Sequence, residues 1–415
     1  MKYLIETFGC RTNQADSDAI ASKLLSKGHS PACKEETADI CVINTCTVTA
    51  KADTQCRNMI RKLRRDYPKA KIVVTGCFAA VAENQSKKIA GMENDENLVF
   101  ERRPETNFSF FTAPVTRARP NLKIQDGCDR FCAYCIVPYA RGRSRSMPVK
   151  DVLEQLDLMH KAGIAEIVLT GIHLGGYGLD LKPETTLLGL LKKITPSPSP
   201  LPRGEKVDTD HCFRIRLSSI DPDEWSDELI DFAARNKMIA RHFHIPLQSG
   251  DDEILQKMGR RYTTERYFRL LSDIKSKAPD CAIGADVIVG FPGETREHFE
   301  RTRQFIEKTP IDYLHVFPYS RRSQTASAKL EDTVSKAEKH RRASVLRAIS
   351  AKKRAEFYKK MAGKKIDVVI EVNRDKKTGR LKGISGNYIP VLLDGDDGLL
   401  GRMVNVTLAE ENICI

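Results

Sequence analysis

The sequence predicts an α/β protein in three parts: an N-terminal parallel βαβ domain, a central partial (βα)6 barrel and a small all-β barrel at the C-terminus. The chain has 415 residues, 41% of them hydrophobic, which is too long for one core and apolar enough for two or three domains. Apolar β-rich runs alternate with helical patterns near the N-terminus and again from residue 120, a pattern typical of parallel sheets. The last fifty residues change to short β-rich runs.

The first 80 residues contain three strand-like runs, KYLIETFG, ICVINT and KIVVTG, separated by helical patterns over 13–27 and 50–66. A cysteine stands at the end of each run: Cys10, Cys46 and Cys77. Because the carboxyl ends of parallel strands gather along one edge of a sheet, we expect these three thiols to meet in space. The alternative is that each is an ordinary buried cysteine near a strand end.

A second series of strand-like runs begins at residue 120, with helical patterns between them. The six runs are NLKIQ, EIVLTG, FRIRLSSI, RHFHIPL, CAIGADVIVGF and YLHVFPYS. Six βα units predict an open or partial barrel with its active groups at the carboxyl ends of the strands. Residues 195–210, between the second and third strands, contain four prolines and are predicted to form an exposed loop insertion.

The segment GCDRFCAYC follows the first barrel strand and holds Cys128, Cys132 and Cys135 in C-x3-C-x2-C spacing. A closed structural metal site normally uses four protein ligands. Three thiolates on a cubane iron–sulfur cluster would leave the fourth iron free to bind a substrate or cofactor. The alternative is a structural zinc with a distant fourth ligand, although the spacing differs from the usual C-x2-C pair. Candidates for that ligand are His160, His173 and Cys212.

The charge of the chain favours an anionic partner such as nucleic acid, because 68 Lys and Arg residues exceed 55 Asp and Glu residues. Arg141, Arg143 and Arg145 follow the cysteine loop and either position RNA phosphates or form a solvated basic loop. Basic residues also dominate 336–365. This segment is predicted to be an amphipathic helix docked on the barrel, a phosphate-contacting surface, or both.

The C-terminal runs IDVVIEV, YIPVLL and MVNVTL predict a compact β-barrel, an architecture often used to bind RNA. The N-terminus lacks a basic region followed by an apolar stretch, and no window approaches about 18 uninterrupted apolar residues. We therefore expect a cytoplasmic protein without a membrane partner. In that compartment clustered cysteines are better explained by metal binding or catalysis than by disulfides.

The C-x3-C-x2-C motif, with Tyr134 before its last cysteine and six βα units behind it, resembles the radical S-adenosylmethionine (SAM) enzymes. The resemblance implies a 4Fe–4S cluster on the three cysteines, with the free iron binding the amino and carboxylate groups of SAM. TGIHLGG, PLQSG and VIVGFPGE resemble the segments that line the SAM site in that family. The cofactor-binding residues thereby implied are Tyr134, Thr170, Gly171, Gln248, Ser249, Gly290 and Glu294.

The whole chain resembles the methylthiotransferases, through GCRTNQADSD, NTCTVT, CIVPYARG, RHFHIPLQSG and GNYIPV. NTCTVT, and CIVPYARG with HVFPYSRR, most resemble the MtaB-type branch, which modifies N6-threonylcarbamoyladenosine at position 37 of tRNA. The family layout implies a methylthiotransferase N-terminal domain over 1–112, a radical SAM core over 113–345 and an RNA-binding TRAM domain over 355–415. It also implies a second, auxiliary 4Fe–4S cluster on Cys10, Cys46 and Cys77.

The activity that the resemblance implies uses two equivalents of SAM. One donates a methyl group to sulfur at the auxiliary cluster, and the other is reductively cleaved to a radical that activates C2 of the adenine; no catalytic side chain is expected beyond the clusters. The implied partners are the tRNA anticodon loop, at adenosine 37, and an electron donor. The alternatives are isopentenyladenosine 37 or a ribosomal-protein aspartate as substrate, or a non-catalytic iron–sulfur protein that binds RNA.

Overall fold

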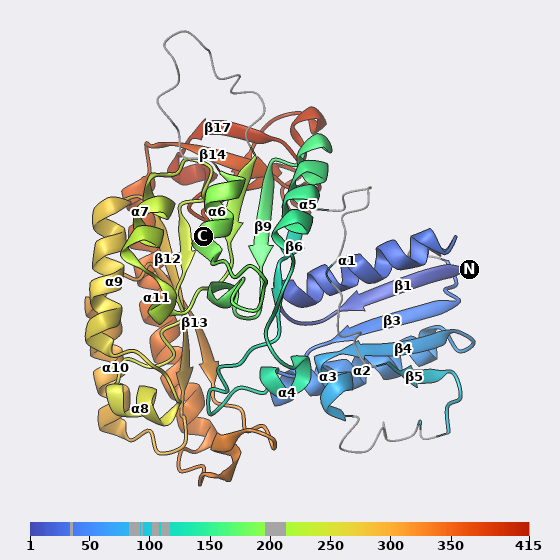
Figure 1. The fold of residues 1–415 in the computed structure, drawn as a ribbon, viewed down its shortest axis with the longest axis horizontal. Helices are drawn as coiled ribbons and strands as arrows, with labels where there is room; N and C mark the ends of the chain where they lie inside the picture. The colour runs from blue at the N-terminus through green and yellow to red at the C-terminus, as the bar shows by residue number, and fades with distance from the viewer. Residues whose placement is uncertain are drawn as a thin grey trace.

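A computed structural model describes residues 1–33, 36–82, 92, 94–101, 108, 117–195 and 213–414. Figure 1 shows an N-terminal sheet with its helices beside a larger α/β core, and C-terminal strands across one end of that core. Parallel strands form the first two of these parts and antiparallel strands the third. The predicted loop insertion lies almost wholly within 196–212, outside the described residues.

The N-terminal sheet has five parallel strands in the order β2-β1-β3-β4-β5. The strands are β1 (Lys2–Thr7), β2 (Ser30–Pro31), β3 (Ile40–Thr45), β4 (Lys71–Gly76) and β5 (Leu98–Phe100). The helices are α1 (Arg11–Ser26), α2 (Ala50–Asp66) and α3 (Cys77–Ala82). The three predicted strands are thus confirmed as the neighbours β1, β3 and β4. α2 has its predicted bounds, and the Thr49 hydroxyl caps it by accepting from Ala52 N at 3.2 Å.

The core contains the six predicted strands, all parallel, in two sheets ordered β6-β9-β10 and β11-β12-β13. A parallel bridge between Ile215 and Ile239 joins the two halves, and Ile220 N also donates to His244 O at 3.1 Å, so the partial barrel continues across a sparsely paired seam. The strands are β6 (Asn121–Lys123), β9 (Glu166–Thr170), β10 (Arg214–Leu217), β11 (His242–His244), β12 (Ala282–Val289) and β13 (Tyr313–Pro318). Figure 1 shows α5, α9 and α10 outside these strands.

The core helices cover the sheets and bury one continuous apolar cluster between helices and strands. They are α4 (Val137–Arg141), α5 (Val149–Lys161), α6 (Leu187–Ile194), α7 (Asp227–Arg235), α8 (Asp252–Lys257), α9 (Thr264–Lys277), α10 (Arg296–Lys308) and α11 (Lys336–Met361). An antiparallel pair, β7 (Gln125–Asp126) and β8 (Arg145–Ser146), flanks the C-x3-C-x2-C loop and is not predicted from the sequence. Two-residue strands carry too little pattern to be recognised.

The C-terminal sheet has four antiparallel strands in the order β16-β15-β14-β17. They are β14 (Lys365–Ile370), β15 (Leu381–Ser385), β16 (Pro390–Leu393) and β17 (Met403–Thr407). The strand β15 escapes prediction because LKGIS contains Gly383, and glycine weakens a strand pattern. That glycine is required by packing, since a Cβ there would overlap the Val368 side chain.

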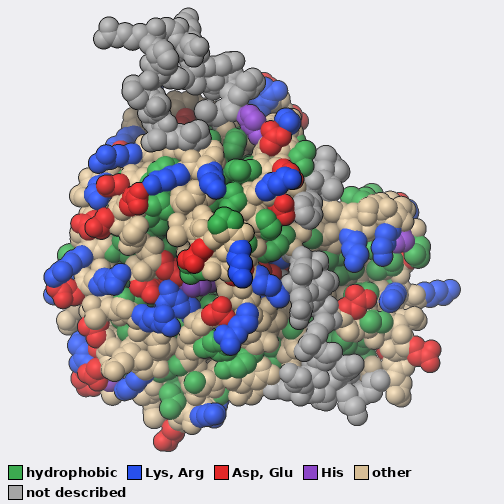
Figure 2. All heavy atoms as spheres, in the orientation of Figure 1, with side chains coloured by type: hydrophobic (Ala, Val, Ile, Leu, Met, Phe, Trp, Pro, Cys, Tyr) green, Lys and Arg blue, Asp and Glu red, His purple; other side chains and the backbone are tan. Residues whose placement is uncertain are grey.

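Tyr388, in the turn between β15 and β16, joins the three parts of the protein. Its ring stacks on His242 of the core with centroids 4.4 Å apart, and Arg11 of α1 donates to its hydroxyl at 3.2 Å. On the face shown in Figure 2, Lys and Arg side chains are interspersed with Asp and Glu. Within the described part of the chain, no helix combines the length and apolarity needed to cross a membrane.

Candidate metal centres

The first cysteine triplet lies at the carboxyl edge of the N-terminal sheet. Cys10 precedes α1, Cys46 directly follows β3, and Cys77 directly follows β4. The structure thus brings together three residues that are far apart in sequence. The Asn13 Oδ1 atom lies 3.6 Å from Cys10 Sγ and 4.0 Å from Cys77 Sγ. Cys46 reaches the same place, since a Cβ added to Gly9 would lie 3.2 Å from its Sγ.

Asn13 and Gly9 hold this edge together, and sequence reasoning gave neither a role. Asn13 Nδ2 donates to Phe8 O and Thr45 O, both at 2.9 Å, and so ties the loop after β1 to the end of β3. Gly9 has φ +108° and a Cβ there would approach Cys46 Cβ to 2.9 Å. A side chain at this position would both strain the backbone and push Cys46 away.

Arg141 connects this triplet to the core, and its burial fits neither of the two roles that the sequence left open, a phosphate-contacting residue or part of a solvated basic loop. Its guanidinium is buried and donates to Cys77 Sγ at 3.2 Å and to Asn13 Oδ1 at 2.6 Å. It also pairs with Asp16 at 3.0 Å and Asp126 at 2.9 Å. All three guanidinium nitrogens of Arg141 are therefore bonded to partners inside the protein, and RNA cannot reach them.

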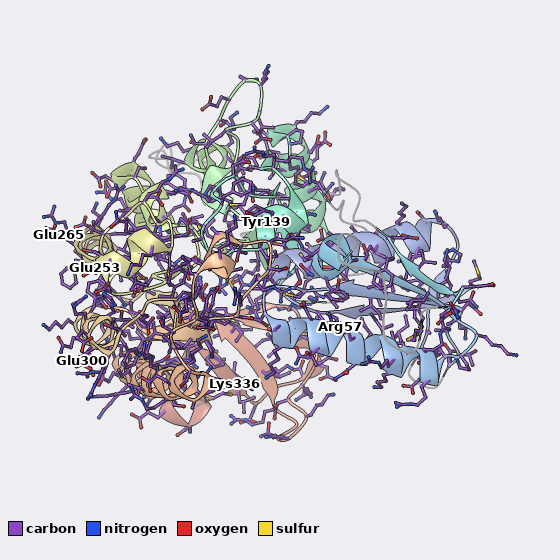
Figure 3. The ribbon with its side chains drawn as sticks, turned by 90° about the horizontal axis from the view of Figure 1, so that it is seen from below. Arg57, Tyr139, Glu253, Glu265, Glu300 and Lys336 are labelled. Atoms are coloured by element: carbon purple, nitrogen blue, oxygen red, sulfur yellow. The ribbon has the colours of Figure 1, made fainter. Side chains whose placement is uncertain are left out.

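The other two arginines of that segment differ from Arg141. Arg143 is exposed and pairs with Asp129 at 3.1 Å, which fits the solvated basic loop. Arg145 is half-buried in β8. In Figure 3, Tyr139, from α4, lies near the junction of the core and the N-terminal sheet, whereas Arg57 lies on α2 in the N-terminal part. The basic groups at this junction thus include both structural and solvent-facing members.

The second triplet lies in the loop between β7 and α4. Cys128 N donates to Gly142 O at 3.0 Å and Cys135 N to Cys132 O at 2.9 Å, which folds the loop on itself. Gly127 has φ +73°, and a Cβ there would overlap the Arg143 carbonyl. Only glycine fits both requirements. The three thiols consequently converge at the carboxyl end of the first barrel strand, the position that the sequence predicts for a functional group.

Two arginines surround the second triplet, and the sequence did not identify either. Arg260 Nη1 donates to Cys132 Sγ at 3.2 Å, while its Nη2 atom binds Asp221 at 2.6 Å. Arg130 donates its backbone N–H to Cys128 Sγ at 3.4 Å. Its guanidinium binds two carboxylates, those of Asp223 at 2.6 Å and Glu224 at 2.7 Å. Cationic donors beside sulfur stabilise thiolates and the clusters they hold.

Burial keeps several of these thiols protonated while no cation is bound. It raises the pKa of Cys46 and of Cys135 to about 12, and that of Cys128 to about 11. A bound metal reverses this preference because a coordinating thiol is deprotonated outright. Sites of this kind are suited to a metal centre and poorly suited to a free nucleophilic cysteine.

The spacing of the sulfur atoms favours clusters over single metal ions. One tetrahedral zinc with Zn–S bonds of about 2.3 Å holds its sulfurs roughly 3.8 Å apart. In the described part of the chain, one group of three metal-ligand side chains has all its ligand atoms within 4.8 Å, and it contains no cysteine. Each cysteine of a cubane cluster binds a different iron, so the sulfurs stand farther apart. Neither described triplet is thus arranged for one tetrahedral ion, whereas three thiolates at each site are the donor set of a 4Fe–4S cluster with one open iron.

The proposed zinc ligands do not join the second triplet. The His173 ring is held by Arg130 Nε at 3.1 Å and is paired with Glu224. The His160 ring packs 5.3 Å from that of Phe213 on the far end of α5. Cys212 lies outside the described residues. Neither described histidine is placed as a fourth ligand.

The predicted SAM-site residues lie in the loops around the second triplet. Tyr134 is half-buried against an apolar cluster that includes Met258, Phe291 and Tyr319. Thr170 ends β9, and Gly171 lets the Gln125 side chain approach, because a Cβ there would lie 2.9 Å from Gln125 Oε1. Gln125 in turn donates to Gly127 O at 2.8 Å and so supports the cysteine loop.

The remaining predicted residues have structural partners. Gln248 adopts φ +65°, and its backbone bridges to β12. The Ser249 hydroxyl is buried 3.3 Å from Thr302 Oγ1, inside the protein. Gly290 N donates to the Glu294 carboxylate at 3.0 Å, and the same carboxylate binds Arg342 of α11 at 2.5 Å. Ser249 and Glu294 thus hold the loops of the predicted SAM site in place.

Comparisons with known proteins agree with this geometry. The model of the Radical SAM superfamily matches residues 122–306, and that of the Uncharacterized protein family UPF0004 matches residues 2–100. Among solved structures, the radical SAM methyltransferase TsrM from Kitasatospora setae is similar at a TM-score of 0.54 and 16% identity. That match covers 79% of this chain and 76% of TsrM, and it shows the fold alone.

Curated proteins that act on tRNA by name are similar to this chain over almost their whole length. Threonylcarbamoyladenosine tRNA methylthiotransferase MtaB of Aquifex aeolicus is 36% identical, over 98% of this chain and 100% of the relative. The protein of the same name from Bacillus subtilis is 35% identical, over 97% and 92%. A tRNA-2-methylthio-N(6)-dimethylallyladenosine synthase of Thermotoga petrophila is 33% identical, over 98% and 94%. The chain belongs to the radical SAM methylthiotransferase family.

Proposed function

We propose that this protein is a tRNA methylthiotransferase that converts N6-threonylcarbamoyladenosine at position 37 into its 2-methylthio derivative. The observation that carries the proposal is the pair of incomplete cysteine triplets, one in the N-terminal sheet and one in the core. The full-length similarity to two proteins named for this activity supports the choice of substrate.

Each triplet supplies three thiolates to a 4Fe–4S cluster, and each leaves one iron for another ligand. Cys10, Cys46 and Cys77 are assigned to the auxiliary cluster; Cys128, Cys132 and Cys135 are assigned to the cluster that binds SAM. When bound, the clusters and SAM supply reductive radical chemistry at an unactivated C–H bond and a methylated sulfur for transfer. Side-chain acid–base chemistry would not suffice at the C2–H bond of adenine.

The residues of the chain position these groups and shield them from water. Tyr134, Thr170, Gly171, Gln248, Ser249, Gly290 and Glu294 are proposed as the shell of the SAM site. Within this shell, Tyr134 packs in an apolar cluster and Gly171 makes room for Gln125, which supports the cysteine loop, whereas Glu294 and Ser249 fix the surrounding loops. Arg260 and Arg130 add positive charge next to sulfur, which offsets the negative charge of a thiolate-bound cluster.

The domain assignment follows the same proposal: 1–112 for the auxiliary cluster, 113–345 for the radical SAM core and 355–415 as a TRAM domain that binds RNA. The antiparallel C-terminal sheet and the net charge of +13 support RNA binding. In Figure 3 the basic helix α11 begins at Lys336 beneath the core. Several of its basic residues are internal, since Arg342 and Lys339 pair with Glu294 and Asp332. An electron donor is also required.

The test is a single-turnover assay with anaerobically reconstituted, reduced protein. SAM and an anticodon stem-loop RNA carrying threonylcarbamoyladenosine at position 37 are added, and the digested nucleosides are analysed by mass spectrometry. We expect the methylthio product, and none from a triple alanine variant at Cys128, Cys132 and Cys135. Cys33→Ala is the matched control because Cys33 is exposed and outside both triplets.

A second candidate substrate has a specific observation behind it, because a relative at 33% identity is named as a synthase for the dimethylallyl nucleoside. The same assay with isopentenyladenosine RNA separates the two. Product from that RNA alone would overturn the proposal. Binding of RNA without any cleavage of SAM would identify a non-catalytic iron–sulfur protein, and product on a ribosomal-protein aspartate would move the substrate to protein.

A further inference from the structure

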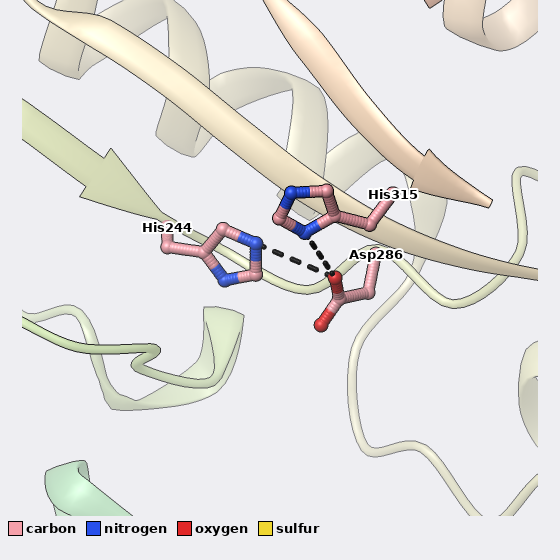
Figure 4. A group of neighbouring side chains, drawn as sticks. All are labelled: His244, Asp286 and His315. Atoms are coloured by element: carbon pink, nitrogen blue, oxygen red, sulfur yellow. Dashed lines mark hydrogen bonds and ion pairs between the residues drawn. The ribbon is translucent and has the colours of Figure 1, made fainter. Parts of the chain in front are cut away.

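Three polar side chains project from neighbouring strands of the core toward one another. His244 ends β11, Asp286 lies within β12 and His315 within β13 (Figure 4). Asp286 Oδ1 lies 3.4 Å from His244 Nε2 and 3.2 Å from His315 Nδ1. Burial alone would raise the pKa of Asp286, but the two imidazoles lower it below its usual range. The carboxylate therefore stays ionised and orients both rings.

His315 also lines a cavity of about 250 Å³ between β13, α11 and the C-terminal sheet. Its walls include the side chains of Tyr313, Arg354, Phe357 and Tyr388. The Arg354 guanidinium lies over the Tyr313 ring, 5.1 Å from its centroid. This cavity combines an aromatic wall with one cation, as do sites that bind a small anionic organic group.

The charge of the cavity favours an anion. Asp312 is the one carboxylate among its lining residues, and its Oδ2 atom accepts from Lys275 Nζ at 2.7 Å and from Ile283 N at 2.6 Å. Its negative charge is thus already matched inside the protein. The Arg354 guanidinium, the outward nitrogen of His315 and the Tyr358 hydroxyl are the lining groups left to meet a ligand, since Asn387 is bonded to Ser385 Oγ and to Asp280 O.

The cavity is within reach of the second cysteine triplet. His315 stands four residues before Tyr319, and Tyr319 packs in the apolar cluster that also holds Tyr134. At about 3.3 Å per residue along a strand, His315 lies roughly 13 Å from Tyr319, at the carboxyl end of the barrel strands. A purine bound between the cysteine loop and His315, with its C2 edge toward the loop, would direct its N6 substituent toward His315 and Arg354.

We infer that this cavity is the binding site for the N6 substituent of the target adenosine, with Arg354 binding its carboxylate and His315 its hydroxyl or carbamoyl atoms. This inference rests on the proposed function. Threonylcarbamoyl groups carry a carboxylate, whereas a dimethylallyl group has no polar atom and would leave the Arg354 charge and the His315 ring without partners. Arg354 and His315 are exposed in this structure. An apolar substituent bound over them would exclude water without offering either group a partner, which costs free energy, so the pocket selects against it.

A divalent cation is the competing occupant, because His244, Asp286 and His315 form the one set with all ligand atoms within 4.8 Å among the described residues. Two histidines and a carboxylate suit a transition metal. However, the neighbouring cavity carries the Arg354 cation, whose positive charge opposes a bound metal ion. The arrangement therefore favours an anionic ligand.

The test compares Arg354→Gln and His315→Phe with Lys352→Gln, a matched loss of one exposed charge on the same helix. Dissociation constants are measured for stem-loop RNAs with threonylcarbamoyladenosine or plain adenosine at position 37. Loss of a charge-assisted hydrogen bond predicts about tenfold or greater weakening of the modified RNA in Arg354→Gln, with plain RNA unchanged. Arg354→Lys should recover part of the loss. Lys352→Gln should weaken both RNAs equally or not at all.

The outcomes separate this inference from the proposed function. Wild-type protein that gives no product on threonylcarbamoyladenosine RNA would refute the proposed function itself. The pocket alone would be refuted if the wild-type protein forms product but Arg354→Gln and His315→Phe both distinguish modified from plain RNA as well as the wild type does. Stoichiometric zinc or iron beyond the two clusters, lost in His315→Phe, would place a metal at the histidines and also overturn the inference. Melting temperature and cluster iron content verify that each variant is folded.

Discussion

Arg141 donates a hydrogen bond from Nε to Cys77 Sγ at 3.2 Å, although the two residues belong to different parts of the chain. Arg141 ends α4, six residues after Cys135 of the second triplet, whereas Cys77 is a member of the first. One buried guanidinium thus ties the loop of one proposed cluster to a ligand of the other. The relative position of the two triplets depends on this contact and on the ion pairs around it.

Replacing Arg141 by Met should destabilise the protein by about 3 kcal/mol or more, because Asp16 and Asp126 would lose a buried partner. The free energy of unfolding in urea measures this. Arg143→Met is the control, since Arg143 is exposed and its loss should cost within about 0.5 kcal/mol. Equal stabilities of the two variants would show that the buried network contributes nothing.

Removing either cysteine triplet should remove one cluster. Anaerobically reconstituted wild-type protein is expected to contain about eight iron atoms, and each triple alanine variant about four. Iron and acid-labile sulfide are measured together. A fall from about one metal to none in either variant, without sulfide, would instead identify a mononuclear site.

The Gly127→Ala variant should lose the second cluster. A Cβ at Gly127 would overlap the Arg143 carbonyl, so the cysteine loop must move. Gly142→Ala is a matched control, because Gly142 also has positive φ, +76°, but nothing lies within 4 Å of its added Cβ. That control should lose about 1–3 kcal/mol of stability through backbone strain, because φ +76° with ψ −161° is a conformation that suits only glycine. Iron content that falls equally in both variants would assign the effect to backbone strain.

Stability should decrease as the pH falls below about 6.5, in part because of His242. The pKa of His242 lies well below its usual value. Burial is the main cause, and the nearby positive charge of Arg216 lowers it further. Below the pKa that His242 has in the unfolded chain, the unfolded chain binds a proton that the folded protein does not bind. The free energy of unfolding therefore keeps falling until the pH reaches the pKa of His242 in the folded protein. One such group contributes up to about 1.4 kcal/mol per pH unit.

The measurement is the free energy of unfolding between pH 7.5 and pH 5 (roughly the window set by the usual histidine pKa) for wild type and His242→Gln. The variant should have a shallower slope although it is less stable overall, since His242 also bonds to the Tyr313 hydroxyl at 2.7 Å. His340→Gln, at an exposed position, should keep the wild-type slope. An unchanged slope in His242→Gln would remove this histidine as the cause.

Much of the architecture could be predicted because local patterns of apolar and polar residues determine it. The β1, β3 and β4 runs are continuous apolar stretches, and α2 has an amphipathic pattern with a threonine cap, so their bounds follow from neighbouring residues. The placement of Cys10, Cys46 and Cys77 at one edge also follows, since parallel strands align their carboxyl ends. By contrast, β7 and β8 are too short for a pattern, and β15 is interrupted by a glycine.

The sequence by itself determined the two cysteine triplets, the parallel strands behind them and the resemblance to methylthiotransferases. Only the tertiary structure decided what the charged residues do: Arg141 and Arg260 contact cysteine sulfurs, and Glu294 clamps a loop to α11. It also brought His315 and Arg354 to one cavity. The reason is that periodicity reports which face of an element is buried, whereas the partner of a long, flexible charged side chain depends on how distant elements pack.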